Sequence, residues 1–289
     1  MVTLHSVVEI RDSTSANSPI QSSLAKKLVL PIFFKIIEKF ADAILVHDIA
    51  FRQQLTKYYR VPGQKIVVIP HGVSSINSPE IEMEVSSEFS RLNGKHIVLF
   101  FGFLSPRKGI EYLLQSFKEV SRKVPNSLLV VAGDAPHYYR QYKKELEKLT
   151  RTLSLQEKVF FAGFIPESVA NRLFSISEIV VFPYTHSPSA SGPLSKALQY
   201  NKAIVATNTE YFENMLENEK TALLIPPKDS EHLADAIIRL LEDNNLRKFI
   251  SKNTQVKATQ NAWAEIGRKT IALYSSLLSN SSKPPLWIS

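Results

Sequence analysis

The chain has 289 residues, a length that predicts about two domains, and its 44% hydrophobic and 21% charged residues are ordinary for a globular protein. It contains no cysteine, which excludes disulfides and thiolate chemistry, and no apolar run long enough to span a bilayer. The net charge of +8 suits an anionic partner such as a nucleotide, a phospholipid headgroup or a nucleic acid. No signal-peptide pattern is found, so we expect a cytoplasmic protein.

The first ninety residues combine short strands with helices. Three apolar runs predict buried strands, at residues 2–5, 43–46 and 66–69. Polar residues at 11–23 predict a loop, and residues 49–59 predict a helix. Another helix is expected to begin at Pro31, because proline suits the first turn of a helix.

The helix expected after Pro31 carries an apolar stripe, formed by Ile32, Phe33, Ile36, Ile37 and Phe40. Four lysines lie beside it, at positions 26, 27, 35 and 39. Such a helix can rest on an anionic membrane surface, which would make the protein membrane-peripheral. A helix packed on the core, with solvated lysines, gives the same pattern, and we favour this second interpretation.

Residues 74–93 are polar and rich in turn residues, which predicts a domain boundary near residue 90. After it, strands are expected at 96–101, 127–132, 158–161, 179–182, 203–206 and 222–225. Helices are expected at 109–123, 137–152, 167–175, 192–200 and 230–243, and residues 245–279 are expected to be helical. This alternation predicts a parallel sheet with helices on both faces, and such sheets bind ligands at the carboxyl ends of their strands.

The turn at residues 102–109 joins a continuous apolar strand to an amphipathic helix. Gly102 ends the strand, and Arg107, Lys108 and Gly109 stand where the helix begins. A helix start has unpaired N–H groups and a partial positive charge, which suit a phosphate, and two cations strengthen that preference. The glycine after Lys108 excludes the Walker loop, which needs Ser or Thr there. A solvated basic helix start is the alternative interpretation.

A second loop at the same edge of the predicted sheet, residues 183–195, is small and polar and leads into a helix. Pro193 presets the start of that helix. The backbone N–H groups of Ser191, Gly192 and Leu194 could hold a second edge of a phosphate group. The alternative is a surface loop rich in proline and serine.

With these segments in order, the chain resembles the family 4 retaining glycosyltransferases, which have the GT-B fold of two facing Rossmann-like domains. The resemblance covers the chain from Val2 to about residue 278. The segments that carry it are residues 2–5, 69–73, 102–109, 161–166 and 191–198, the last followed by 203–207. Their shared order and spacing make the resemblance more specific than any one of them.

The resemblance implies a hexosyltransferase that moves a sugar from a UDP- or GDP-sugar donor to a sugar, lipid or protein acceptor with retention. Lys108, assisted by Arg107, would neutralise the donor diphosphate, and the helix start near Ser191 would donate hydrogen bonds to it. The segment from Gly163 to Pro166 would border the base. The implied donor-binding residues are Gly102, Arg107, Lys108, Gly163, Phe164, Ser191, Gly192 and Leu194.

His5 and Lys108 are the implied catalytic residues. His5 would face the donor sugar or the acceptor from the other domain, although a plain strand-end histidine is the alternative. The scheme needs no metal and no cofactor. The chain departs from the family at Phe103, where an arginine is common, and at Lys196, where the second of two paired glutamates is expected. A lysine cannot accept hydrogen bonds from ribose hydroxyls.

The resemblance also implies a domain arrangement. Residues 1–90 would be a partial N-terminal Rossmann-like domain, 91–260 the nucleotide-sugar-binding domain, 261–279 a helix returning toward the first domain, and 280–289 a tail. Ninety residues are fewer than a typical domain has. A fragment of a longer protein, a second chain that completes the domain, or a late start codon would each explain this.

Other functions stay open. The missing glutamates and the short first domain fit a non-catalytic or partner-dependent donor-binding subunit. A sugar-nucleotide epimerase of the same architecture fits the motifs less well. A nucleic-acid partner is not expected, because the aromatic residues are not interleaved with basic ones in a stacking pattern.

Overall fold

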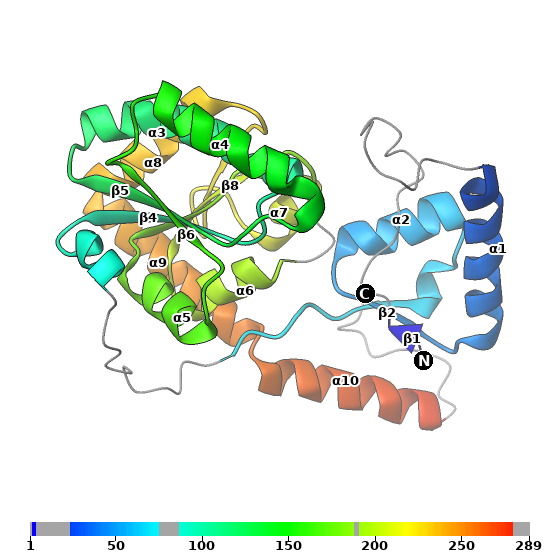
Figure 1. The fold of residues 1–289 in the computed structure, drawn as a ribbon. Coiled ribbons are helices and arrows are strands. Elements are labelled where there is room, and N and C mark those ends of the chain that lie inside the picture. Colours follow the sequence, from blue (N-terminus) through cyan, green and yellow to red (C-terminus); the bar gives the residue numbers. More distant parts are fainter. Residues whose placement is uncertain (1, 4–23, 75–86, 188–190, 280–289) are drawn as a thin grey trace. The chain divides into compact units, whose positions relative to one another are not determined.

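The computed structural model describes residues 2–3, 24–74, 87–187 and 191–279, and the chain divides into two compact units (Figure 1). The first unit comprises the described residues of Met1–Gly72 and Trp263–Ser289. The second comprises those of Val73–Ser187 and Ser191–Ala262. Both ends of the chain therefore contribute to the first unit, and the second unit is built from the residues between them.

The first unit contains a parallel three-stranded sheet in the order β1 (Val2–Thr3), β2 (Ile44–Val46), β3 (Ile66–Val68). Ile44 and Val46 of β2 pack into a cluster with α1 (Leu24–Phe40) and α2 (Ile49–Tyr59). Leu45, between them, packs with α10 (Trp263–Leu278). Because successive side chains of a strand point to opposite faces, the sheet is covered by α1 and α2 on one face and by α10 on the other.

The expectation that Pro31 begins a helix is wrong. α1 begins at Leu24, and Pro31 lies inside it. The preceding residues Leu24–Leu30 include Ala, Lys and Leu, which favour helix strongly enough to extend it upstream of the proline. Pro31 has no N–H to donate, so one i→i−4 hydrogen bond of α1 is not made.

The second unit is built on a six-stranded parallel sheet. Its order is β6 (Val159–Gly163), β5 (Ser127–Ala132), β4 (His96–Phe101), β7 (Ile179–Phe182), β8 (Ala203–Thr207) and β9 (Leu223–Ile225). Its helices are α3 (Ile110–Lys123), α4 (Arg140–Thr152), α5 (Glu167–Ile176), α6 (Gly192–Gln199), α7 (Glu210–Met215), α8 (Ser230–Glu242) and α9 (Asn244–Gln260). Short 3₁₀ turns occupy Gly63–Lys65 in the first unit, and Ser87–Leu92, Pro106–Lys108 and His137–Tyr139 in the second.

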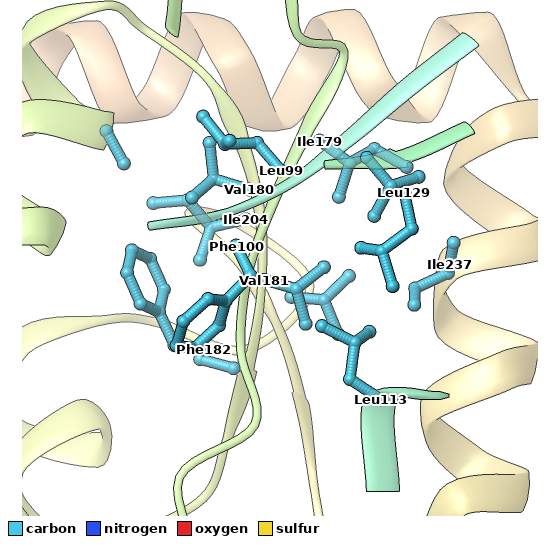
Figure 2. Close-up of a cluster of buried hydrophobic side chains, with 14 of the residues drawn as sticks. Leu99, Phe100, Leu113, Leu129, Ile179, Val180, Val181, Phe182, Ile204 and Ile237 are labelled. Atoms are coloured by element: carbon cyan, nitrogen blue, oxygen red, sulfur yellow. The ribbon is translucent and has the colours of Figure 1, made fainter. Parts of the chain in front are cut away.

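The core of the second unit is centred on β4 and β7 (Figure 2). Leu99 and Phe100 of β4 and Val180 and Val181 of β7 are fully buried. Leu113 of α3 packs into this cluster too, as do residues of the outer strands. Burial of consecutive residues is what the unbroken apolar runs predict, because a strand covered on both faces needs apolar side chains on both.

The expected α/β fold, a Rossmann-like parallel sheet flanked by helices, is confirmed, and each expected strand after residue 90 is present. Two details differ. α7 was not expected, because its six residues are too few for a helical period to show. The long helical stretch at 245–279 is divided into α9 and α10. In the described parts of the chain, every helix is too short or too polar to cross a membrane.

Candidate functional site

The site lies where the path of the chain through the second sheet reverses. From β4 the chain moves outward through β5 to β6, then returns to the other side of β4 and moves outward through β7, β8 and β9. β4 and β7 are therefore neighbours whose following loops diverge. In open parallel sheets such a switch point leaves a crevice at the carboxyl ends of the strands, where ligands bind. The two loops singled out in the sequence are the ones that follow β4 and β7.

The turn after β4 is held against the loop after β7 at Gly109. Gly109 has a φ of 64° and precedes α3, and a Cβ added there would meet the carbonyl oxygen of Pro183 at 2.0 Å. Only glycine fits a left-handed conformation with a backbone oxygen so close. Next to this contact, the N–H of Thr185 donates a hydrogen bond of 3.0 Å to the carbonyl oxygen of Arg107. The two loops are thus joined through their backbones.

This junction places Lys108 on Tyr184. The Nζ atom of Lys108 lies 3.6 Å from the centroid of the Tyr184 ring, a close cation–π contact. Burial lowers the pKa of Lys108 to about 8, and the neighbouring positive charge of Arg107 acts in the same direction. A half-buried ammonium group with a lowered pKa lacks a full hydration shell, and a bound anion would restore the preference for the charged form.

Tyr184 links the two loops and was missed in the sequence. Its side chain is 1% exposed, and its hydroxyl group has no hydrogen-bond partner in the described parts of the chain. Burial raises the pKa of Tyr184 to about 12, with the nearby Ser191 side chain acting in the opposite direction. The ring of Tyr184 therefore joins Lys108 to the loop that leads into α6. A single aromatic residue two positions after a strand carries no periodic signal, so it could not be selected from the sequence alone.

The start of α6 is capped by Ser191. The N–H of Leu194 donates to the Ser191 hydroxyl at 3.2 Å, and the N–H of Ser191 donates to the Tyr211 hydroxyl at 3.1 Å. This differs from the expectation that the amides of Ser191, Gly192 and Leu194 all face a ligand. Two of them are engaged by side chains, because Pro193 brings no N–H of its own and the cap turns to Leu194. For the Gly192 amide, no partner is found among the described residues.

The unexpected helix α7 supports this loop. Its Tyr211 accepts the hydrogen bond from Ser191 and donates its own N–H to the Ser187 hydroxyl at 2.9 Å. Tyr211 is itself buried. Tyr211, in the helix that follows β8, therefore holds both Ser187 and Ser191, the residues on each side of the segment 188–190.

Three glycines stand where β4, β5 and β6 end. Gly102 donates its N–H to Ala132 at 2.9 Å, and Gly133 donates to Gly163 at 2.8 Å, so the ladder extends to the edge of the sheet. A Cβ on Gly133 would lie 2.0 Å from the carbonyl oxygen of Gly102. Because these three positions have no side chain, a ligand can approach the backbone closely at the ends of the three strands.

The predicted site residues do not all lie close to one another. A Cβ built on Gly102 would lie 3.8 Å from the Cγ of Pro193, so the turn after β4 borders the start of α6. Gly163 ends β6, which is separated from β4 by β5. Phe164, next to it, is 80% exposed, and Phe103 is 67% exposed. Arg107 has an exposed side chain and joins the site through its backbone. His5 lies outside the described residues.

Lys196 is engaged in an ion pair and does not have the role that the expected glutamate would have. Its Nζ pairs with Glu167 of α5 at 3.2 Å, and its side chain is 16% exposed. The positive charge at this position is therefore compensated from within the unit. Elsewhere in the described residues, no three His, Asp or Glu side chains gather closely enough to hold a metal ion.

A family model described as "Glycosyl transferases group 1" matches residues 83–257, which is more than half of the chain. An alpha-D-kanosaminyltransferase of Streptomyces kanamyceticus is 25% identical over 225 residues, which are 75% of this chain and 55% of the relative. A phosphatidyl-myo-inositol mannosyltransferase of Mycobacterium leprae is 24% identical over 270 residues, 91% of this chain and 67% of that protein. The chain thus spans little more than half the length of the kanosaminyltransferase.

The fold is also found among solved structures. HepE of Anabaena, in complex with UDP and glucose, aligns with a TM-score of 0.75 and 21% identity, over 96% of this chain and 71% of that one. At this identity the likeness concerns the fold, and it agrees with the parallel sheet and flanking helices described above.

Proposed function

We propose, since the chain belongs to the Glycosyl transferases group 1 family, that it moves a sugar from a nucleotide-sugar donor to an acceptor and retains the anomeric configuration. The observation that carries this proposal is the close contact between the turn that holds Lys108 and the loop that leads into α6, at the switch point of the sheet. A cation and a helix start side by side suit a diphosphate.

The proposed role of these residues follows from where negative charge develops during sugar transfer. When the bond between the sugar and the diphosphate breaks, negative charge grows on the leaving phosphate oxygens. Lys108 would neutralise that charge, and the N–H of Gly192 with the dipole of α6 would add hydrogen bonding. Because the Gly109 contact and the Tyr184 ring already hold Lys108 in place, little rearrangement is needed when the charge appears.

We propose that the nucleotide of the donor is uridine diphosphate and not guanosine diphosphate. HepE, which shares the fold, is described with UDP and glucose, and this supports the choice. Gly163 and Phe164 would lie at the base end of the donor, and the exposed Phe164 ring is available for stacking. His5 stays proposed as the residue that faces the reacting sugar.

One observation favours a second candidate, a donor-binding subunit without turnover of its own. Lys196 stands where an acidic residue would hold donor hydroxyls, and its pairing with Glu167 leaves no acceptor at that position. This candidate predicts nucleotide binding without sugar transfer.

Binding of UDP, measured by calorimetry, tests the proposal. We expect wild-type chain to bind UDP, and Lys108→Ala to weaken binding about 30-fold, as loss of one charge-assisted contact of about 2 kcal/mol would. The matched control is Lys202→Ala. Burial also lowers the pKa of Lys202 to about 8, but this lysine precedes β8, at the opposite edge of the sheet, where it donates to the Ser175 carbonyl group.

Equal losses in the two variants, or no binding of UDP or GDP by the wild type, would refute the donor site. A mass-spectrometric assay for UDP released from UDP-sugars then separates the two candidates. Release in the presence of an acceptor supports the transferase, whereas tight binding with no release across a broad acceptor panel supports the subunit without turnover.

A further inference from the structure

The outer surface of α1 is apolar although it is exposed. Ile32, Phe33, Ile36 and Phe40 are all exposed large hydrophobic residues, with Ile36 at 52% and Phe40 at 79%. α1 packs on its sheet through Leu30, Phe34 and Ile37, and Phe33 also touches the ring of Phe34 edge-on. Single exposed apolar residues are ordinary, but four within nine residues of one helix form a patch. We call these four residues the outer stripe of α1.

Helical geometry places the outer stripe beside the face of α1 that packs on the core. Each residue advances about 100° around the axis, so Ile32, Ile36, Phe40 and Phe33 fall within an arc of about 100°. The centre of that arc lies more than a quarter turn from Phe34, the residue of α1 that is buried in the core. A shallow apolar hollow borders the stripe, lined by Pro31, Ile32, Lys35, Ile36, Glu38 and Lys39.

Positive charge runs along one border of the outer stripe. Lys35 and Lys39 are one turn apart next to Ile32 and Ile36, both are exposed, and neither makes an ion pair within the described residues. Lysine stems can lie along apolar surface while the ammonium groups reach outward to phosphate. An apolar stripe with a cationic border is the pattern of a helix that lies in the interface of an anionic bilayer.

A second exposed apolar surface of the first unit, on α10, lacks this border. On α10, Ile271, Tyr274 and Leu278 are exposed, but the same geometry places Thr270 and Ser275 at the edges of their stripe. The charge of Arg268 is paired with Glu265 at 2.6 Å. The two helices therefore differ in charge and not in apolarity. Both expose apolar residues, but only α1 has unpaired lysines beside them.

We propose that the outer stripe of α1 docks on the surface of an anionic lipid bilayer, with Ile32, Phe33, Ile36 and Phe40 entering the interface and Lys35 and Lys39 contacting lipid phosphates. The helix then lies parallel to the membrane plane, and its core face stays on the sheet. This docking is independent of nucleotide binding, because the outer stripe and the donor site belong to different units.

Vesicle co-sedimentation of the full chain tests the proposal. We expect binding to vesicles of phosphatidylglycerol and phosphatidylcholine, at least tenfold weaker binding to phosphatidylcholine alone, and weaker binding at high salt, on the order seen for interfacial helices with cationic borders. Ile36→Glu should weaken binding about tenfold or more, because a carboxylate would enter the interface. Ile271→Glu is the matched control, since it makes the same change at an exposed isoleucine of α10 and should leave binding unchanged.

Each result decides the proposal. Loss in Ile36→Glu with retention in Ile271→Glu supports it, and Phe40→Ser gives a second reading if Ile36→Glu does not fold. Absence of vesicle binding overturns the proposal, as do equal losses in the two glutamate variants. It is also overturned if light scattering shows a dimer that Ile36→Glu converts to monomers, because the outer stripe would then be a contact between copies of this chain.

Discussion

The starts of α3 and α6 lie at the same edge of one sheet, yet they are built differently. α3 follows a glycine without a side-chain cap and carries two cations just before it, Arg107 and Lys108. α6 is capped by Ser191, begins with Gly192 and Pro193, and has no charge in its first turn. One helix start thus supplies charge and the other supplies amides.

The difference indicates why the proposed phosphate site needs both turns. Among the described residues, Lys108 has no anionic partner at the α3 turn, where its burial against Tyr184 is unfavourable for charge. The α6 start has amides, but side chains already use two of them. Joined by the Gly109–Pro183 contact, the two starts become complementary. Substitutions in one turn or the other can therefore separate the contribution of charge from that of the amides.

The largest effect is expected where the two turns are joined. Gly109→Ala adds a left-handed alanine and a methyl group 2.0 Å from a carbonyl oxygen, so we expect a loss of about 3 kcal/mol or more in the free energy of unfolding. Urea denaturation measures it. Gly94→Ala is the control, because Gly94 also has a positive φ, of 69°, but no atom lies within 4 Å of an added Cβ. It should cost about 1 kcal/mol. Equal losses would show that the two turns are not in close contact.

A change in pH tests the charge of the α3 turn. With the pKa of Lys108 near 8 in the free chain, the ammonium form dominates at pH 7 and is lost as the pH rises. A bound diphosphate favours the charged form, so UDP affinity should fall about tenfold from pH 7 to pH 9. Lys108→Arg keeps its charge throughout, and its affinity should change much less over this range. A parallel fall in wild type and Lys108→Arg would exclude Lys108 as the titrating group.

Removal of the cap tests the α6 start. Ser191→Ala deletes the acceptor for the Leu194 N–H, and loss of such a cap costs about 1 kcal/mol of stability. Thermal or urea unfolding gives this value. The proposal adds a second expectation, that bound UDP recovers part of the loss because its phosphate accepts from the uncapped amide. A destabilised variant whose loss is unchanged by saturating UDP would place the phosphate away from α6.

The smallest effect is expected at Lys196. Its partner Glu167 is 82% exposed, and exposed ion pairs contribute about 0.5 kcal/mol or less. Lys196→Ala should therefore change stability little, and UDP affinity should stay within about twofold. A large gain in donor affinity from Lys196→Glu would show that this position does contact donor hydroxyls, and would weaken the case for a subunit without turnover.

Much of the second unit could be predicted because its local signals agree with its fold. Unbroken apolar runs such as residues 96–101 and 179–182 locate buried strands, and Gly102 and Pro106 mark where one of them ends. The switch point then follows from the order of strands and helices. Lys108 could be selected because a basic helix start after a strand has a known electrostatic preference.

The remaining features depend on contacts between distant residues. Nothing in the neighbourhood of Tyr184 or Tyr211 indicates that one lies beneath Lys108 and the other receives the Ser191 amide, since those partners are many residues away. The helix start predicted at Pro31 was wrong because the helix-favouring residues before the proline overrode a local rule for helix starts. The outer stripe of α1 was visible as a pattern, but only the structure shows which apolar residues face the core.

α10 has a consequence for biosynthesis. The sheet residues Leu45, Val67 and Ile69 are made early, but the helix residues that cover them, Ile266 and Leu273, are made after the whole second unit. At ordinary rates of synthesis of about 5–20 residues per second, one face of the early strands waits on the order of ten seconds or more for its cover. The interval gives a ribosome-bound chain time to fold the second unit first, so we expect α10 to cover the sheet of the first unit as the last step of folding.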